Sequence, residues 1–119
     1  MKGSTPTLDT INTHNPKARE KTIESYLIEQ CKAHGFMTLK FISSLTGVPD
    51  RIVIGGGHTV FVELKRPKGN DLSERQKIVI DKMRAAGADV QIIRTLSQVD
   101  QLMTTLADSA NIQLKHKND

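Results

Sequence analysis

The 119-residue sequence has one cysteine, no tryptophan, one tyrosine and three phenylalanines. The single Cys31 excludes an intramolecular disulfide and a zinc site built from cysteines, and we expect it to be buried in a helix. Because aromatic side chains are so few, the chain has little surface for stacking unpaired bases. A nucleic-acid partner would therefore be contacted mainly through its backbone. No apolar run reaches the length of a membrane span, and the polar N-terminus lacks the hydrophobic core of a signal peptide. The sequence therefore predicts a cytoplasmic protein without membrane contact.

The length and composition predict one soluble globular domain. Hydrophobic residues make up 37% and charged residues 25%, which suits a single core with one sheet and a few helices. Residues 1–14 are polar and without periodicity, so we expect a mobile arm, followed by a domain at 15–108 and a charged tail at 109–119. The net charge of +4 is compatible with a nucleic-acid partner but is shared by many other proteins.

Hydrophobic periodicity and turn residues predict the element order α-β-β-β-α-β-α. A helix begins at Asn15-Pro16 and ends before Gly35, a later helix is capped by Ser73, and a last helix is capped by Ser97. The predicted strands cover residues 36–44, 52–54, 59–64 and 89–94, with Asp50 at the mouth of the second. The segment between the third and fourth strands is long enough for a parallel crossover, so we expect a mixed sheet flanked by helices. The Gly-rich turn between the second and third strands predicts no specific contact.

Two acids and a lysine interrupt apolar strands. Glu63 and Lys65 lie two positions apart, so their side chains leave the strand on the same face, and a hairpin would bring Asp50 alongside. Ionic groups at a hydrophobic sheet are costly unless they pair or bind a metal. The arrangement suits a divalent cation held by carboxylate oxygens with a lysine beside it. The alternative is a surface charge pair between Glu63 and Lys65 that contributes little.

The motif formed by Pro49-Asp50 and Glu63-Leu64-Lys65 resembles that of the PD-(D/E)xK nucleases. Within that superfamily, the segments 47–50, 62–65 and 72–76, with the Gly-rich turn between the first two, resemble the virus-type replication-repair nuclease (VRR-NUC) domain. The likeness extends from about residue 20 to residue 94. It implies an α/β fold with the restriction-endonuclease-like core that these nucleases share.

The resemblance also implies a metal site. Asp50, Glu63 and the backbone carbonyl of Leu64 would bind one or two Mg²⁺ or Mn²⁺ ions, and Lys65 would lie beside the attacking water. In the family, a glutamate in an E-x-x-I pattern on the first helix approaches the metal, and Glu20 matches it. The alternative for Glu20 is an ordinary solvated helix residue, and Glu24 near the same helix face stays open.

Four further residues have candidate roles near this site. The resemblance places Gln76 close to the reacting phosphate, whereas its spacing from Ser73 predicts a helix capping box. Arg51, Arg66 and Lys68 flank the acids and could contact backbone phosphates, and the alternative for each, taken singly, is a plain surface charge.

The resemblance implies a Mg²⁺- or Mn²⁺-dependent, structure-selective DNA endonuclease. We expect branched DNA, such as a Holliday junction or a flap, as the substrate, with a role in replication, recombination or repair in a bacterial or phage-infected cell. A homodimer would supply two active sites at a fixed spacing, and no organic cofactor is expected. The alternatives are a sequence-specific restriction-type nuclease and a non-catalytic DNA-binding protein.

Overall fold

The computed structural model describes residues 16–69 and 71–118 and has the predicted element order. The elements are α2 (Pro16–Ala33), β1 (Met37–Lys40), β2 (Arg51–Gly55), β3 (His58–Leu64), α3 (Glu74–Ala85), β4 (Asp89–Ile93) and α4 (Leu96–Asn118). The predicted arm at 1–14 and the predicted cap at Asn15 lie outside the described residues, and the division into arm, domain and tail stays a prediction. None of the helices in the described part of the chain is long and apolar enough to cross a bilayer.

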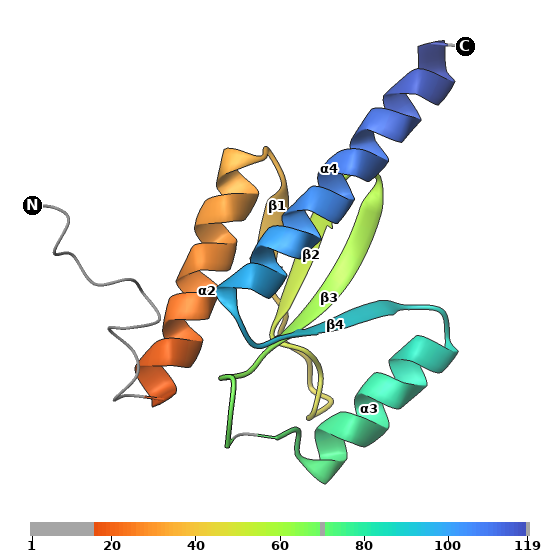
Figure 1. Cartoon of the computed structure of the whole chain (residues 1–119). Helices are drawn as coiled ribbons and strands as arrows, with labels where there is room; N and C mark the ends of the chain where they lie inside the picture. The colour runs from red at the N-terminus through yellow and green to blue at the C-terminus, as the bar shows by residue number, and fades with distance from the viewer. Residues whose placement is uncertain (1–15, 70, 119) are drawn as a thin grey trace, which may run out of the picture.

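The four strands form one mixed sheet in the order β1-β2-β3-β4 (Figure 1). The first two pairings are antiparallel, and β3 pairs in parallel with β4. The parallel crossover through α3 is therefore confirmed, as is the α/β class with a mixed sheet flanked by helices. In the register, Val62 lies opposite Arg51 on one side and opposite Gln91 on the other.

Two helices cover one face of the sheet and the third covers part of the other. The core between the sheet and α2 and α4 contains Ile23, Leu27, Cys31, Val53, Val60, Val62, Leu64, Ile93, Val99, Met103 and Leu106. The predicted burial of Cys31 is confirmed, and this burial raises the pKa of its thiol to about 11. Val79 and Ile80 of α3 and Val90 of β4 are buried outside that core. Because Val90 and Ile93 leave β4 on opposite faces, α3 packs against the face that α2 and α4 leave open.

The predicted boundaries of two elements are wrong. The first strand does not extend to Ser44, because β2 begins at Arg51 and gives β1 no partner beyond Lys40. The last helix is capped by Thr95 and not by Ser97, since Thr95 Oγ1 accepts from Gln98 N at 3.1 Å. That helix also continues to Asn118, past the loss of pattern near Ser109.

The Gly-rich turn makes a close contact, contrary to the prediction. Gly56 and Gly57 have φ values of 60° and 83°, the positive values that a two-residue type I′ hairpin requires. A Cβ on Gly56 would lie 2.0 Å from the carbonyl oxygen of Leu106 in α4. The turn therefore lies directly against α4, and glycine is required there for space as well as for backbone conformation.

Candidate active site

Asp50 is fixed beside the end of β3 by hydrogen bonds in both directions. Its Oδ2 accepts from the backbone N–H of Leu64 at 2.9 Å. Its own carbonyl oxygen accepts from the backbone N–H of Phe41 at 2.9 Å, just beyond β1. Asp50, which the sequence predicts to lie alongside Glu63, is therefore held at Leu64, the residue that follows Glu63 in β3.

Glu63 is buried among polar partners on the α3 side of the sheet. It is the one charged residue in the described chain that is buried, with 1% of its surface exposed. Its Oε2 accepts from the side-chain amide of Gln76 at 2.8 Å and lies 3.3 Å from Lys65 Nζ. Side-chain exposures of 2% for Glu63 and 12% for Lys65 exclude the alternative of a surface charge pair.

This environment raises the pKa of Glu63 to about 7. Burial is the largest cause, because it disfavours the charged carboxylate, and the negative charge of Asp50 acts in the same direction. The Lys65 ammonium and the hydrogen bond from Gln76 oppose the shift without cancelling it. A cation between the two carboxylates would remove both penalties.

The donor set fits a hard divalent cation. Glu63 Oε1 is buried and has no hydrogen-bond partner, a costly state for a carboxylate oxygen unless something binds it. Within residues 16–69 and 71–118, nowhere do three or more His, Cys, Asp or Glu side chains lie together so that they could hold a metal by themselves. A metal here would therefore take the oxygens of Asp50 and Glu63 with backbone carbonyl or water oxygens, which Mg²⁺ accepts. The Leu64 carbonyl stays the predicted third ligand.

A cleft of about 570 Å³ opens beside Asp50 on the α2 side of the sheet. It is lined by Glu20, Lys21, Glu24, Lys40, Asp50, Leu64 and Arg66. Glu20 thus faces the same space as Asp50, as the helical stripe predicts. Glu24 lines the cleft too, and its Oε2 is bound to Arg51 Nη1 at 3.0 Å.

The flanking cations differ in their surroundings. Arg51 is mostly buried and donates to Glu24 and, through Nε, to Thr38 Oγ1 at 3.1 Å, so its charge is used within the fold. Arg66 lines the cleft and donates to the carbonyl of Gly69 at 3.3 Å. Lys68 is exposed and does not line the cleft. Their contacts with DNA stay predictions.

Two lysines that the sequence did not single out also line the cleft. Lys40 lies opposite Arg51 in the register of β1 and β2, and Lys21 follows Glu20 on α2. The signal for Lys40 is the strand pairing itself, which places the end of β1 beside the start of β2. Its position could be deduced only once that register was known.

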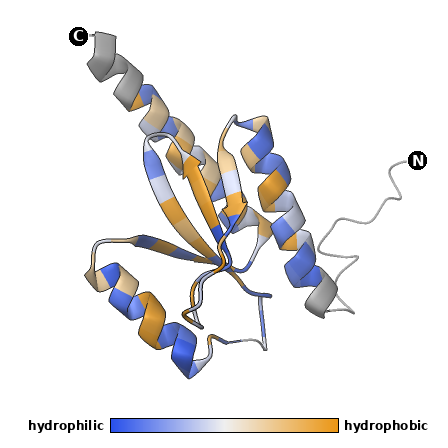
Figure 2. Ribbon diagram, turned by 180° about the vertical axis from the view of Figure 1, so that it is seen from behind, coloured by the Kyte–Doolittle hydropathy of each residue, from blue (hydrophilic) through white to orange (hydrophobic). Residues whose placement is uncertain are grey.

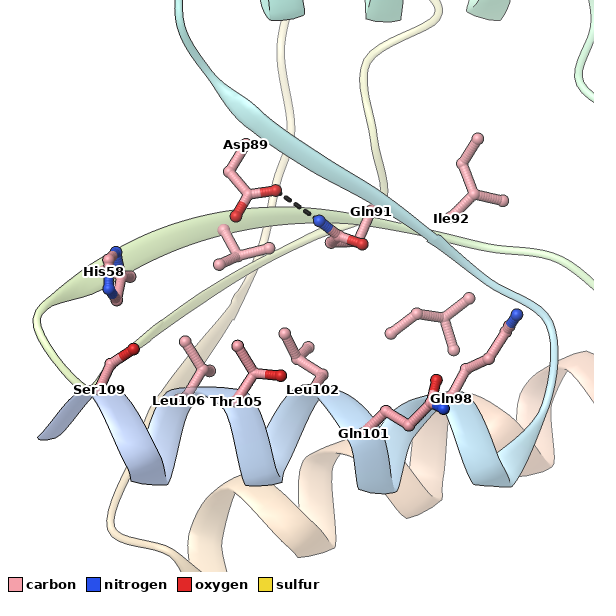
Figure 3. Close-up of a pocket in the computed structure, with 12 residues that line it drawn as sticks. His58, Asp89, Gln91, Ile92, Gln98, Gln101, Leu102, Thr105, Leu106 and Ser109 are labelled. Atoms are coloured by element: carbon pink, nitrogen blue, oxygen red, sulfur yellow. Dashed lines mark hydrogen bonds between the residues drawn. The ribbon is translucent and has the colours of Figure 1, made fainter. Parts of the chain in front are cut away.

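A second cavity of about 320 Å³ lies between α4 and the β3–β4 pair (Figure 3). Its lining is largely neutral, with Gln98, Gln101 and Thr105 from α4, and Gln91 donates to Asp89 within it. It shares no residue with the cleft beside Asp50 and includes none of the predicted site residues. The candidate chemistry therefore stays at the ends of β2 and β3.

Comparison with known proteins identifies the fold. No family model matches the sequence, and no curated protein matches it. A solved structure described as a VRR_NUC domain is similar, with 27% sequence identity and a TM-score of 0.64. The match covers 72% of this chain and 95% of the other. The resemblance inferred from the motifs is thus confirmed, and the chain has the mixed α/β fold of a VRR-NUC domain, a nuclease fold of the PD-(D/E)xK type.

Proposed function

We propose that the protein is a divalent-metal-dependent DNA endonuclease that cuts branched duplexes. The observation that carries this proposal is the buried Glu63 carboxylate, with one oxygen without a partner and the other held by Gln76 and Lys65. A buried carboxylate oxygen without a partner costs free energy, and a bound cation would supply that partner.

Each polar group has a distinct part in this proposal. Asp50 and Glu63 would hold Mg²⁺ or Mn²⁺, which when bound supplies positive charge that acidifies water and offsets charge on the phosphoryl oxygens. Lys65 would orient the attacking water and stabilise the negative charge that develops on the phosphate. Gln76 fixes the rotamer of Glu63 through its 2.8 Å hydrogen bond. Glu20 would contribute to the metal from across the cleft, through water or directly.

The cations around the cleft suit the backbone of DNA. Lys21, Lys40 and Arg66 share its lining with Glu20 and Asp50, so positive side chains surround the acids. Contacts of this kind position a phosphodiester without reading its sequence. With three phenylalanines and one tyrosine in the chain, base stacking would add little, which favours recognition of DNA shape over sequence.

We further propose that two copies act together on a Holliday junction or a related branch, in the cytoplasm of a bacterial or phage-infected cell. Resolution of a junction requires paired cuts on two strands, and a dimer supplies two sites related by a two-fold axis.

The direct test uses the purified full chain with labelled junction, flap, single-stranded and linear substrates of matched sequence. Cleavage of branched substrates with Mg²⁺ or Mn²⁺, and none with EDTA or with Glu63→Gln, is the expected result. Cutting of one linear sequence in preference to all branches would support a restriction-type nuclease instead. DNA binding without any metal-dependent product would support a non-catalytic role and contradict the proposal.

A further inference from the structure

The loop between β1 and β2 presents an isoleucine to solvent beside the candidate active site. Ile42 is 81% exposed, the highest value among the exposed large hydrophobic residues of the described chain. The residue before it, Phe41, donates its backbone N–H to the carbonyl oxygen of Asp50 at 2.9 Å. Ile42 therefore follows directly on the contact that holds Asp50, and Lys40, two positions earlier, lines the cleft. Figure 2 shows the loop extending beyond the strands, at the end of the sheet where β3 ends.

Contacts with α3 hold the far half of this loop. The carbonyl oxygen of Thr46 accepts from Arg75 Nε at 3.3 Å. Gly47 has a φ of 92°, and a Cβ on it would lie 3.0 Å from the carbonyl oxygen of Arg75, so the loop backbone packs directly on the start of α3. The loop is thus anchored at the active site and at α3. An exposed side chain on an anchored loop can press on a bound molecule without first being ordered, which favours binding.

The composition of the loop suits DNA. Residues 41–49 carry no charge, and Ser43, Ser44 and Thr46 follow the isoleucine. Ser44 and Thr46 are exposed, and hydroxyl groups of this kind contact phosphate oxygens without reading sequence. The side chain of Ile42 has no hydrogen-bonding group, so it cannot identify a base by its edge. Apolar side chains of this type contact DNA instead by entering between successive base pairs, which they partly unstack.

The free-energy cost of unstacking selects the kind of DNA. In an intact linear duplex, insertion of an apolar side chain must overcome the stacking of two neighbouring base pairs. At a branch point the continuous stack is interrupted, so the same insertion breaks less stacking. The gain from burying the isoleucine is similar in both cases, because it depends on the apolar area removed from water. The side chain therefore favours branched over linear duplexes.

We propose that Ile42 is a specificity-determining residue that inserts between base pairs at the branch point and so places a nearby phosphodiester at Asp50. The inference rests on the proposed nuclease function and deepens it, because it names the feature of branched DNA that the protein recognises. The cations of the cleft, Lys21, Lys40 and Arg66, would hold the backbone of the same DNA. Recognition by an aliphatic side chain also agrees with a chain that has few aromatic residues.

The first test measures insertion without cleavage. The full chain is mixed in Ca²⁺ with a four-way junction that carries 2-aminopurine in a base pair at the branch point, a probe whose fluorescence rises on unstacking. The wild type and Ile42→Leu should raise the fluorescence, and Ile42→Ala should not. Ile112→Ala is the control, since Ile112 is an exposed isoleucine of α4, and it should match the wild type. An equal rise with Ile42→Ala, or a wild type that binds the junction without any rise, would overturn the proposal.

The second test measures selectivity in the cleavage reaction. Ile42→Ala should reduce the ratio of cleavage rates on branched and linear duplexes by about tenfold, because most of the apolar area that is buried at the branch is lost. The variant should keep the circular dichroism spectrum and the metal-dependent rise in Tm of the wild type, since Ile42 binds no metal. An active wild type whose selectivity is unchanged in Ile42→Ala would refute the role of Ile42 alone. A wild type that cuts none of the substrates would refute the proposed function, and the fluorescence test would still decide the insertion.

Discussion

The side-chain amide of Gln76 joins the start of α3 to the buried carboxylate of Glu63. Its Nε2 donates to Glu63 Oε2 at 2.8 Å, and its Oε1 accepts from the backbone N–H of Ser73 at 3.0 Å. Ser73 Oγ in turn accepts from the backbone N–H of Gln76 at 3.1 Å, which completes the capping box. The predicted capping box is therefore confirmed, and the same amide also binds Glu63, whereas the place of Gln76 beside the reacting phosphate stays a prediction.

Replacing Gln76 should separate these two roles when it is compared with Ser73→Ala. Both Gln76→Ala and Ser73→Ala should lower the free energy of unfolding by about 1 kcal/mol, because each breaks the cap. Only Gln76→Ala removes the donor to Glu63, so we expect at least a tenfold loss of metal-dependent cleavage for it and a small loss for Ser73→Ala. Chemical unfolding and cleavage rates measure the two effects. Equal cleavage by the two variants would show that Gln76 acts through the cap alone.

The stability of the metal-free protein should fall as the pH rises. The pKa of Glu63 is about 7 in the folded state, against the usual value of 4.5, so the folded protein retains a proton that the unfolded chain has lost. The free energy of unfolding should therefore decrease between pH 5 and 7 and level off above, by up to about 3 kcal/mol. Glu63→Gln should abolish this decrease. Urea unfolding in EDTA across pH 5–8 is the measurement, and a rise in stability for the wild type over that range would contradict the assigned environment.

Mg²⁺ or Mn²⁺ should stabilise the wild type by binding the folded state. At a metal concentration a hundred times Kd, the gain is about 2.7 kcal/mol, seen as a higher Tm that EDTA reverses. Asp50→Asn and Glu63→Gln should each lose this gain, because each removes a charged ligand. Glu29→Gln on the exposed surface of α2 is the control and should keep the full response. A gain that persists in both site variants would place the metal elsewhere.

Lys40 and Arg51 are paired across β1 and β2, yet their substitutions should have different effects. Lys40→Ala should weaken DNA binding and reduce the salt dependence of log Kd by about one counterion, with little change in Tm. Arg51→Ala should mainly lower Tm, because it leaves the partly buried Glu24 without its partner. Fluorescence anisotropy of labelled DNA in Ca²⁺ at several salt concentrations measures the binding, and thermal unfolding measures the Tm of each variant. Lys82 is an exposed residue of α3, so Lys82→Ala is the matched lysine control for DNA binding.

Gly56→Ala should be far more destabilising than Gly35→Ala. Both glycines have positive φ, 60° and 75°, so both substitutions incur about 1–2 kcal/mol of backbone strain. A Cβ at Gly35 meets nothing within 4 Å, whereas at Gly56 it meets the Leu106 carbonyl of α4 at 2.0 Å. Overpacking against backbone adds about 1–3 kcal/mol. Similar unfolding free energies for the two variants would mean that the hairpin moves away from α4 without cost.

The sequence by itself determined the order of helices and strands, the mixed sheet and the positions of the acids on its strands. The apolar run at 59–64 predicts a buried strand, and the spacing of Glu63 and Lys65 places both on one face because strand geometry has a period of two. The capping box at Ser73 and Gln76 was likewise local, since it depends on residues three positions apart. Interactions within a few residues are fixed by backbone geometry, so the sequence predicts them directly.

Only the tertiary structure decided which of these groups meet. The hydrogen bond from Gln76 to Glu63, the pairing of Arg51 with Glu24 and the place of Lys40 in the cleft join residues 11 to 27 positions apart. The contact of Gly56 with Leu106 joins residues 50 positions apart and depends on how α4 lies on the sheet. The predicted start of α4 is wrong because Thr95 and Ser97 are both good caps. The end of β4 at Ile93 favours Thr95. Burial and strand register decide such contacts, and neither is encoded in the local pattern.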